Sequence, residues 1–216
     1  NIKLAVGHVE RHNPAVTVLN DYLRNSNSGN LLTLTARRFS NYPERITDVG
    51  VLFDLTIHDV DVICSIVRKP VKRVFAAGGK FMNELHEDQV CLNIMFENNI
   101  IGICQTNWLT PMKVRELNIT TTSNYINLDY LNRKINVFSS DYGEIDNSNL
   151  SKIPISINNE EILPEDVEPL KSELIDFLKA IRDNSSPLVT GEDGYLSVKI
   201  VEAGLRSMKE SKIIEL

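Results

Sequence analysis

The sequence is poor in cysteine, and its three cysteines stand in apolar surroundings without a CxxC pair: Cys64, Cys91 and Cys104. Zinc sites and disulfide frameworks both need cysteines at short or regular spacings. The pattern therefore predicts three free thiols that pack as small core residues in a reducing compartment. We expect a cytoplasmic protein.

Long apolar runs are also missing. No stretch reaches the roughly 20 apolar residues that a membrane-spanning helix needs, and nothing resembles a signal peptide. The formal net charge is -6, a sign that repels nucleic acid and anionic membranes. We therefore expect neither a nucleic acid nor a membrane among the partners.

A GxGxxG motif is absent from the 216 residues. The stretch "AAGGKF" at 76–81 has the wrong glycine spacing and no helix after it. The chain also opens without methionine, directly into "IKLAVGHV", which predicts a buried strand over residues 2–9. We interpret the sequence as a fragment whose upstream part is missing.

The rest of the chain predicts a layered domain, with 42% hydrophobic and 24% charged residues. Asn13 as a cap before Pro14 predicts a helix start. An Asn-rich turn and closely spaced strands indicate hairpins, and hence antiparallel pairing. The predicted class is α/β (α+β), with a mostly antiparallel open sheet and helices on one face. Strands are predicted at 31–39, 89–96, 100–110, 114–122, 125–131, 132–138 and after Pro70, and helices from Pro14, up to Val67, around 170–181 and at 194–212.

One predicted helix carries a narrow polar stripe, formed by Gly50, Asp54, His58, Asp61 and Ser65. Most of its other positions are apolar, which is typical of a buried helix. The stripe then faces a cleft or an internal network. His58 is a candidate acid/base group, oriented by the carboxylate one turn away.

Three other interpretations of the stripe stay open. It could be a solvated face, or a His–Asp network that only fixes packing. Asp54 and His58 could also hold a metal in a hydrolase. No third ligand has convincing spacing, so no metal site is predicted.

Around this stripe the sequence resembles a known family. "GVLFDLTIHDVD", with "YPER" and "VGHVERHNPAV" before it, is similar to the Gfo/Idh/MocA oxidoreductases, and "NWLTPMKVRELNIT" and "TGEDGYLSVKIVEAGLRSMKES" extend the resemblance over most of the chain. The resemblance implies an N-terminal Rossmann domain that binds NAD or NADP. It also implies a C-terminal open sheet, often the oligomer interface, and a reaction at a hydroxyl of a sugar, cyclitol or nucleotide-linked sugar.

The resemblance assigns roles to single residues. His58 and Asp54 match the family's catalytic histidine and acid, with His58 exchanging the proton and Asp54 orienting it or holding the substrate. Arg11, His12 and Asn13 follow the last Rossmann strand, where ligands bind, and are predicted to contact substrate. Helix capping explains Asn13 equally well, and His12 stands where the family has phenylalanine.

Four further residues fall on similar positions. Arg45 in "YPER" resembles a substrate-side arginine, and a surface loop residue is the alternative. Trp108, Lys113 and Arg115 resemble a pattern of sugar-nucleotide members. For Trp108 we expect packing, and for Lys113 and Arg115 a solvated strand face.

The predicted organisation is a remnant of the dinucleotide-binding domain over 1–28 and a substrate-binding and oligomerisation domain over 29–216. The family's Glu-Lys-Pro tripeptide is absent, like GxGxxG, so most cofactor-binding residues would lie upstream. We therefore expect part of a NAD(P)-dependent sugar dehydrogenase that is inactive in isolation. A non-catalytic binding or oligomerisation module of the same fold is the alternative.

Overall fold

The computed structural model describes residues 2–26, 28–142 and 155–216. Its strands form a nine-stranded sheet in the order β8-β7-β6-β5-β1-β4-β3-β2-β9. β1 and β4 are parallel, and the other neighbouring pairs are antiparallel. The predicted open, mostly antiparallel sheet is confirmed. The strands are β1 (Leu31–Phe39), β2 (Val71–Gly79), β3 (Gln89–Phe96), β4 (Ile101–Asn107), β5 (Val114–Thr121), β6 (Asn124–Asp129), β7 (Lys134–Tyr142), β8 (Ile155–Ile162) and β9 (Ile214–Glu215).

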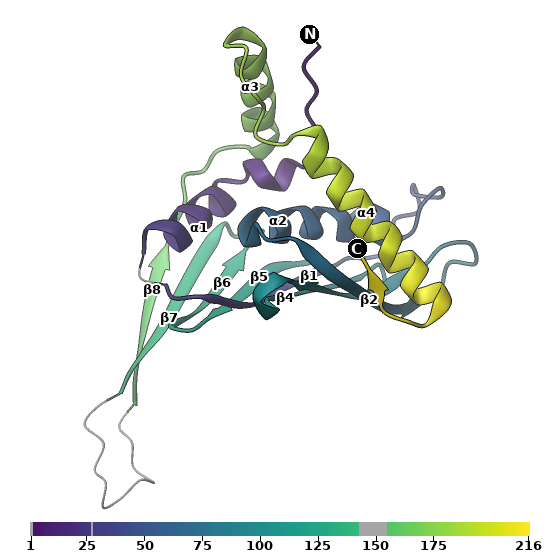
Figure 1. The fold of residues 1–216 in the computed structure, drawn as a ribbon, viewed down its shortest axis with the longest axis horizontal. Coiled ribbons are helices and arrows are strands. Elements are labelled where there is room, and N and C mark those ends of the chain that lie inside the picture. Colours follow the sequence, from purple (N-terminus) through teal and green to yellow (C-terminus); the bar gives the residue numbers. More distant parts are fainter. Residues whose placement is uncertain (1, 27, 143–154) are drawn as a thin grey trace, which may run out of the picture.

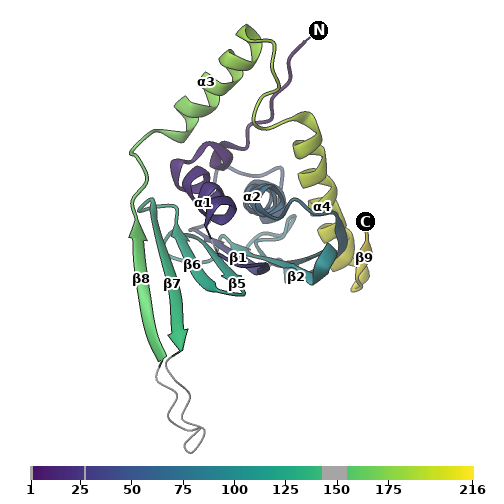
Figure 2. The ribbon, with the colours of Figure 1, turned by 60° about the vertical axis from the view of Figure 1, so that its left-hand side comes forward.

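Three helices cover one face of this sheet: α1 (Pro14–Asn25), α2 (Ile57–Val67) and α4 (Gly191–Glu210). No helix of the described chain lies over the opposite face (Figures 1 and 2). Strand β3 shows the consequence, because Leu92 and Ile94 are fully buried under the helices while Met95 is 38% exposed. We call the uncovered side the open face.

The N-terminal residues differ from the prediction. Residues 2–8 pair with no strand of the described chain, and a short 3-10 helix, η1 (Val9–His12), follows them. Ile2 and Leu4 are 98% and 66% exposed. The predicted buried strand is therefore wrong, because a β-stretch needs a neighbouring strand to pair with.

Helix α1 begins as predicted. The Asn13 side chain accepts a hydrogen bond from the backbone N–H of Ala15, and Pro14 occupies the first turn. Ala15, Val16 and Leu19 enter the same buried cluster as the sheet.

Helix α2 is preceded by a π-helical turn, η2 (Leu52–Thr56). Glu87 holds its start: the Glu87 backbone carbonyl accepts from the N–H of Val51, and its carboxylate accepts from the N–H of Leu52. A Cβ on Gly50 would lie 2.2 Å from that carboxylate, so only glycine at this position lets the Glu87 side chain approach without a clash. Such π-turns are frequent at functional sites.

Helix α3 (Pro169–Arg182) has the predicted amphipathic pattern but stands away from the sheet (Figures 1 and 2). Ala180 is buried and Phe177 partly buried, but the other apolar side chains remain half or more exposed, at Leu170, Leu174, Ile175, Leu178 and Ile181. Strands β8 and β9 were not predicted. β8 is an exposed edge strand. Such a strand buries neither face, so its sequence needs no alternation of apolar and polar residues.

Candidate active site

His58 and Asp54 lie at the start of the buried helix, on α2 and η2, and both are half-buried. No hydrogen bond joins the two residues in the described structure. The role of Asp54, orienting His58 or holding the substrate, stays a prediction. Burial raises the pKa of the Asp54 carboxyl, while Trp108 and then Arg45 oppose the rise.

Beneath them lies a buried ion-pair network that the sequence interpretation missed. Arg38 on β1 donates from Nε to both Asp59 oxygens at 3.0 and 3.1 Å, and from Nη2 to Oδ1 at 2.8 Å. Its Nη1 donates to Glu10 Oε1 at 3.1 Å. The side chains of Arg38 and Asp59 are 4% and 2% exposed. Arg38 also lies over the ring of Tyr130, 5.7 Å from its centroid.

The ion pairs of this network keep Arg38 and Glu10 charged despite their burial. Burial alone would lower the pKa of Arg38, but Asp59 and Glu10 raise it above its ordinary value. Burial would raise the pKa of Glu10, yet Arg38 holds it below its ordinary value. Burial raises the pKa of Asp59 while Arg38 opposes the rise, so the Asp59 charge depends on Arg38.

This environment keeps His58 uncharged. Burial and then Arg38 lower its pKa to about 4, and Glu10 only partly compensates. Near pH 7 its imidazole is therefore neutral and able to accept a proton.

Two further arginines surround Asp54. Arg115 lies on the covered side of β5, 3.9 Å from Glu10, and its side chain is 37% exposed. We expected Arg115 to lie on a solvated strand face, but the strand register turns its side chain to the side of the sheet that the helices cover. Arg45 is exposed in the loop before η2, near enough to Asp54 to lower its pKa. Trp108 is 1% exposed, so its predicted packing role is confirmed.

Arg11, Asp61 and Asp193 form a second charged cluster. Arg11 lies 3.7 Å from Asp61 and 3.3 Å from Asp193, and its Nη2 donates to the Leu188 carbonyl. Burial raises the pKa of Asp61 to about 7, although Arg11 opposes the rise. Arg11 is thus engaged in structure, and its contact with a substrate remains a prediction.

His12 and Asn13 also have structural surroundings. His12 is 8% exposed and lines an apolar groove of about 320 Å³ beside Pro14 and Val167. Asn13 caps α1 and donates from Nδ2 to Glu10. The capping interpretation of Asn13 is confirmed, and substrate contact by either residue stays a prediction.

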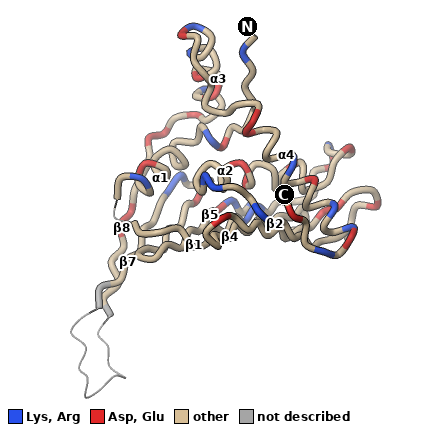
Figure 3. Tube along the Cα trace, in the orientation of Figure 1, with Lys and Arg blue, Asp and Glu red and all other residues tan. Residues whose placement is uncertain are grey.

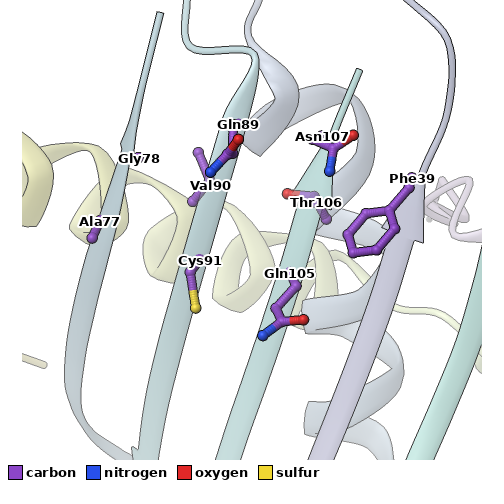
Figure 4. Close-up of a pocket in the computed structure, with 9 residues that line it drawn as sticks. All are labelled: Phe39, Ala77, Gly78, Gln89, Val90, Cys91, Gln105, Thr106 and Asn107. Atoms are coloured by element: carbon purple, nitrogen blue, oxygen red, sulfur yellow. The ribbon is translucent and has the colours of Figure 1, made fainter. Parts of the chain in front are cut away.

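The open face has a hollow of its own, about 390 Å³ in volume. Figure 4 shows it over β1 to β4, with Phe39 on β1 at one side and the small residues Ala77 and Gly78 on β2 at the other. Neither His58 nor Asp54 lines it. This hollow and the candidate site therefore lie on opposite sides of the sheet.

The described residues contain no group of three or more His, Cys, Asp or Glu side chains placed to hold a metal ion. The described cysteines are free thiols, as expected. No helix among these residues is long and apolar enough to cross a membrane. Acidic and basic positions are interspersed along the chain (Figure 3).

Residues 18–126, just over half the chain, match the family described as the GFO/IDH/MocA C-terminal domain. The chain belongs to this family. The sequence resemblance is therefore confirmed at the level of the family.

Individual relatives of this family member are distant. The UDP-N-acetylglucosamine 3-dehydrogenase of Acidithiobacillus ferrooxidans is 25% identical over 95% of this chain and 61% of that protein. The myo-inositol 2-dehydrogenase of Thermotoga maritima is 23% identical over 77% of the chain and 49% of that protein. The chain thus spans about half to three fifths of these relatives.

Solved structures share the fold. The structure of the Acidithiobacillus enzyme superposes with a TM-score of 0.83 at 22% identity, covering 97% of this chain and 63% of that one. Levoglucosan dehydrogenase in complex with NADH and levoglucosan superposes with a TM-score of 0.80 at 18% identity, covering 100% and 66%.

Proposed function

We propose that this family member is the C-terminal, substrate-handling part of a NAD(P)-dependent dehydrogenase acting on a hydroxyl of a sugar, cyclitol or nucleotide-linked sugar. The observation that carries the proposal is His58, a half-buried imidazole one helical turn from Asp54; burial and then Arg38 lower the pKa of this imidazole to about 4. Neutral imidazole can take the hydroxyl proton when an alcohol is oxidised. Arg45 and Arg115 offer charged donors to a polar substrate.

The described residues do not form a site for the dinucleotide. Gly78 and Gly79 lie within strand β2 of the sheet and not in a loop before a helix. In this proposal a separate nucleotide-binding part holds NAD or NADP and supplies the hydride acceptor. Residues 1–28 are the end of that part, although α1 packs on the sheet.

Helix α3 provides a surface for such a part. Leu174, Ile175 and Leu178 are 55–64% exposed on a helix that stands away from the body. Ile2 and Leu4 are also exposed, and Figures 1 and 2 show the N-terminus on the same side of the molecule as α3. Exposed apolar patches of this kind mark interaction sites.

The open face suits self-association. Phe75, Met95, Ile101 and Tyr125 are 38–45% exposed there, and Met95 pairs directly across from Ile101. We propose a homo-oligomer through this face. The exposed apolar side chains of the open face also favour the second candidate function, a non-catalytic oligomerisation module.

Turnover of a fusion tests the proposal. The chain would be joined to the nucleotide-binding half of the Acidithiobacillus relative and supplied with UDP-N-acetylglucosamine or myo-inositol. We expect reduced nicotinamide to form with the fusion and not with the chain alone, and His58→Ala to slow it by about 10²–10⁴-fold. His86→Ala, in the β2–β3 loop, is the control.

Two results would decide against the dehydrogenase. Equal rates for His58→Ala and the parent fusion would remove His58 from the chemistry. Oligomers that form normally while the fusion binds neither sugar, as measured by calorimetry, would favour the non-catalytic module.

A further inference from the structure

Two histidine rings meet below the candidate site. His8, just before η1, and His58, on α2, have ring centroids 5.8 Å apart and planes at 89°. His8 is only 5% exposed. The sequence interpretation gave His8 no role, since nothing in its local pattern indicates that it reaches α2.

Each ring has one buried nitrogen without a hydrogen-bond partner, Nε2 of His8 and Nδ1 of His58. A buried polar atom without a partner costs about 1–3 kcal/mol, so both nitrogens need one. In a neutral imidazole one ring nitrogen donates and the other accepts. One water molecule between the two rings can therefore accept a hydrogen bond from one of these nitrogens and donate one to the other.

We propose that Nδ1–H of neutral His58 donates a hydrogen bond to a bridging water molecule, which in turn donates to Nε2 of His8. The two nitrogens make no direct hydrogen bond, and the ring separation of 5.8 Å suits one bridging water. His8 then carries its own proton on Nδ1. It acts as a positioning residue that selects one tautomer of His58.

The usual orienting groups are already occupied. Asp59 is bound bidentately by Arg38, and Glu10 accepts from both Arg38 and Asn13. Asp54 makes no hydrogen bond to His58. A base is commonly oriented by a third group, and among these neighbours His8 supplies the free acceptor.

The tautomer matters for proton transfer. With the proton on Nδ1, Nε2 of His58 has a free lone pair for a substrate hydroxyl. With the proton on Nε2, that nitrogen could not accept one. This consequence rests on the proposed function, whereas the contact between the rings does not.

The charges around the pair favour the neutral form of both rings. Arg38, Glu10 and Arg115 face His58, and Arg11 and Asp193 face His8. Burial, then His58 and then Arg11, lower the pKa of His8 to about 4, with Asp193 opposing them. Near pH 7 neither ring is charged, so a neutral donor–acceptor contact is the one available.

Nitrogen NMR of the histidine rings tests the inference in the chain as it exists. Its four histidines, His8, His12, His58 and His86, can be assigned by single substitutions. Ring nitrogen shifts distinguish the two neutral tautomers. We expect His58 near pH 7 to be almost entirely in the Nδ1–H form, and to lose that preference in His8→Phe.

Two variants complete the design. His8→Gln keeps an acceptor oxygen and is expected to retain the Nδ1–H form of His58. His12→Phe removes another buried histidine of the same segment and is expected to leave the His58 tautomer unchanged.

An Nε2–H tautomer of His58 in the wild-type chain would overturn the inference, and this measurement needs no variant to fold. So would an unchanged His58 tautomer in folded His8→Phe.

Activity separates this inference from the proposed function. In the active fusion, His8→Phe is expected to lower kcat by about 10–100-fold with KM little changed, and His8→Gln to restore most of it. If the tautomer shifts as expected while the fusion shows no turnover, the contact stands and the dehydrogenase proposal fails.

Discussion

Arginine has different surroundings on the covered and open faces of the sheet, as Arg37 and Arg38 show. These residues are neighbours on β1 and point to opposite faces. Arg37 is 44% exposed and pairs with Glu116 at 2.6 Å on the open face. Arg38 is 4% exposed and is held by Asp59 and Glu10. A charge is tolerated on the open face, while the covered face requires a partner for it.

Apolar residues show the same contrast. Ile94 is fully buried on β3, and its neighbour Met95 is 38% exposed across from Ile101. The covered face has its packing partners within this chain. The open face, like α3, has apolar side chains left for a partner.

The largest expected effect concerns Arg38. Arg38→Met leaves Asp59 as a buried charge without compensation, and we expect a loss of about 3–5 kcal/mol in the free energy of unfolding. Arg37→Met is the matched control and should cost less than about 1 kcal/mol. Denaturant unfolding measures both, and equal losses would break the contrast between the faces.

The next effect depends on pH. The folded pKa of Asp61, about 7, lies above its ordinary value of 3.8, so its stability contribution is lost as pH rises through 7. Asp61→Asn should match the wild type near pH 4 and exceed it by on the order of 2–4 kcal/mol at pH 8.

The measurement is the difference between the two unfolding curves at each pH. His8 and His58 act in the opposite direction, because their lowered pKa values, about 4, remove stability as pH falls from 6.5. Both histidines are present in the wild type and in Asp61→Asn, so their contributions cancel in the difference between the two curves. A difference between Asp61→Asn and the wild type that stays flat with pH would refute the prediction.

A smaller effect is expected at the start of α2. A Cβ at Gly50 would collide with the Glu87 carboxylate that caps Leu52. Gly50→Ala should therefore cost about 1–2 kcal/mol, the range for a lost cap. In a double-mutant cycle with Glu87→Ala, the two losses should not add, and full additivity would show that Glu87 is not the cause.

The smallest effect on folding is expected on the open face. Ile101→Thr should change the free energy of unfolding by no more than about 0.5 kcal/mol, whereas Ile94→Ala should cost about 2–5 kcal/mol. Analytical ultracentrifugation should show weaker self-association for Ile101→Thr. An unchanged oligomer would argue against the open face as the interface.

Much of the local structure was predictable because it depends on near neighbours. Asn13 and Pro14 specify the start of α1. Asn98 and Asn99 make the predicted turn with φ near 60°, a conformation that asparagine tolerates. The alternation of residues 31–39 predicted the strand β1. The candidate pair Asp54 and His58 followed from the family resemblance.

Other features were beyond sequence reasoning because they depend on distant partners. Nothing in the local pattern gives Asp59 a role, because its partner Arg38 lies 21 residues earlier. The ring that meets His58 edge-on belongs to His8, 50 positions away. Strand β8 has no apolar signal because it is an exposed edge.

By itself the sequence determined the positions of most helices and strands, the apolar character of α2, and the family to which the chain belongs. These depend on spacing along a few turns or one strand. Only the tertiary structure decided which charges pair, that Arg115 turns towards the site, and that α3 keeps its apolar side exposed. Those outcomes depend on sheet register and helix docking, which bring together residues that the sequence keeps far apart.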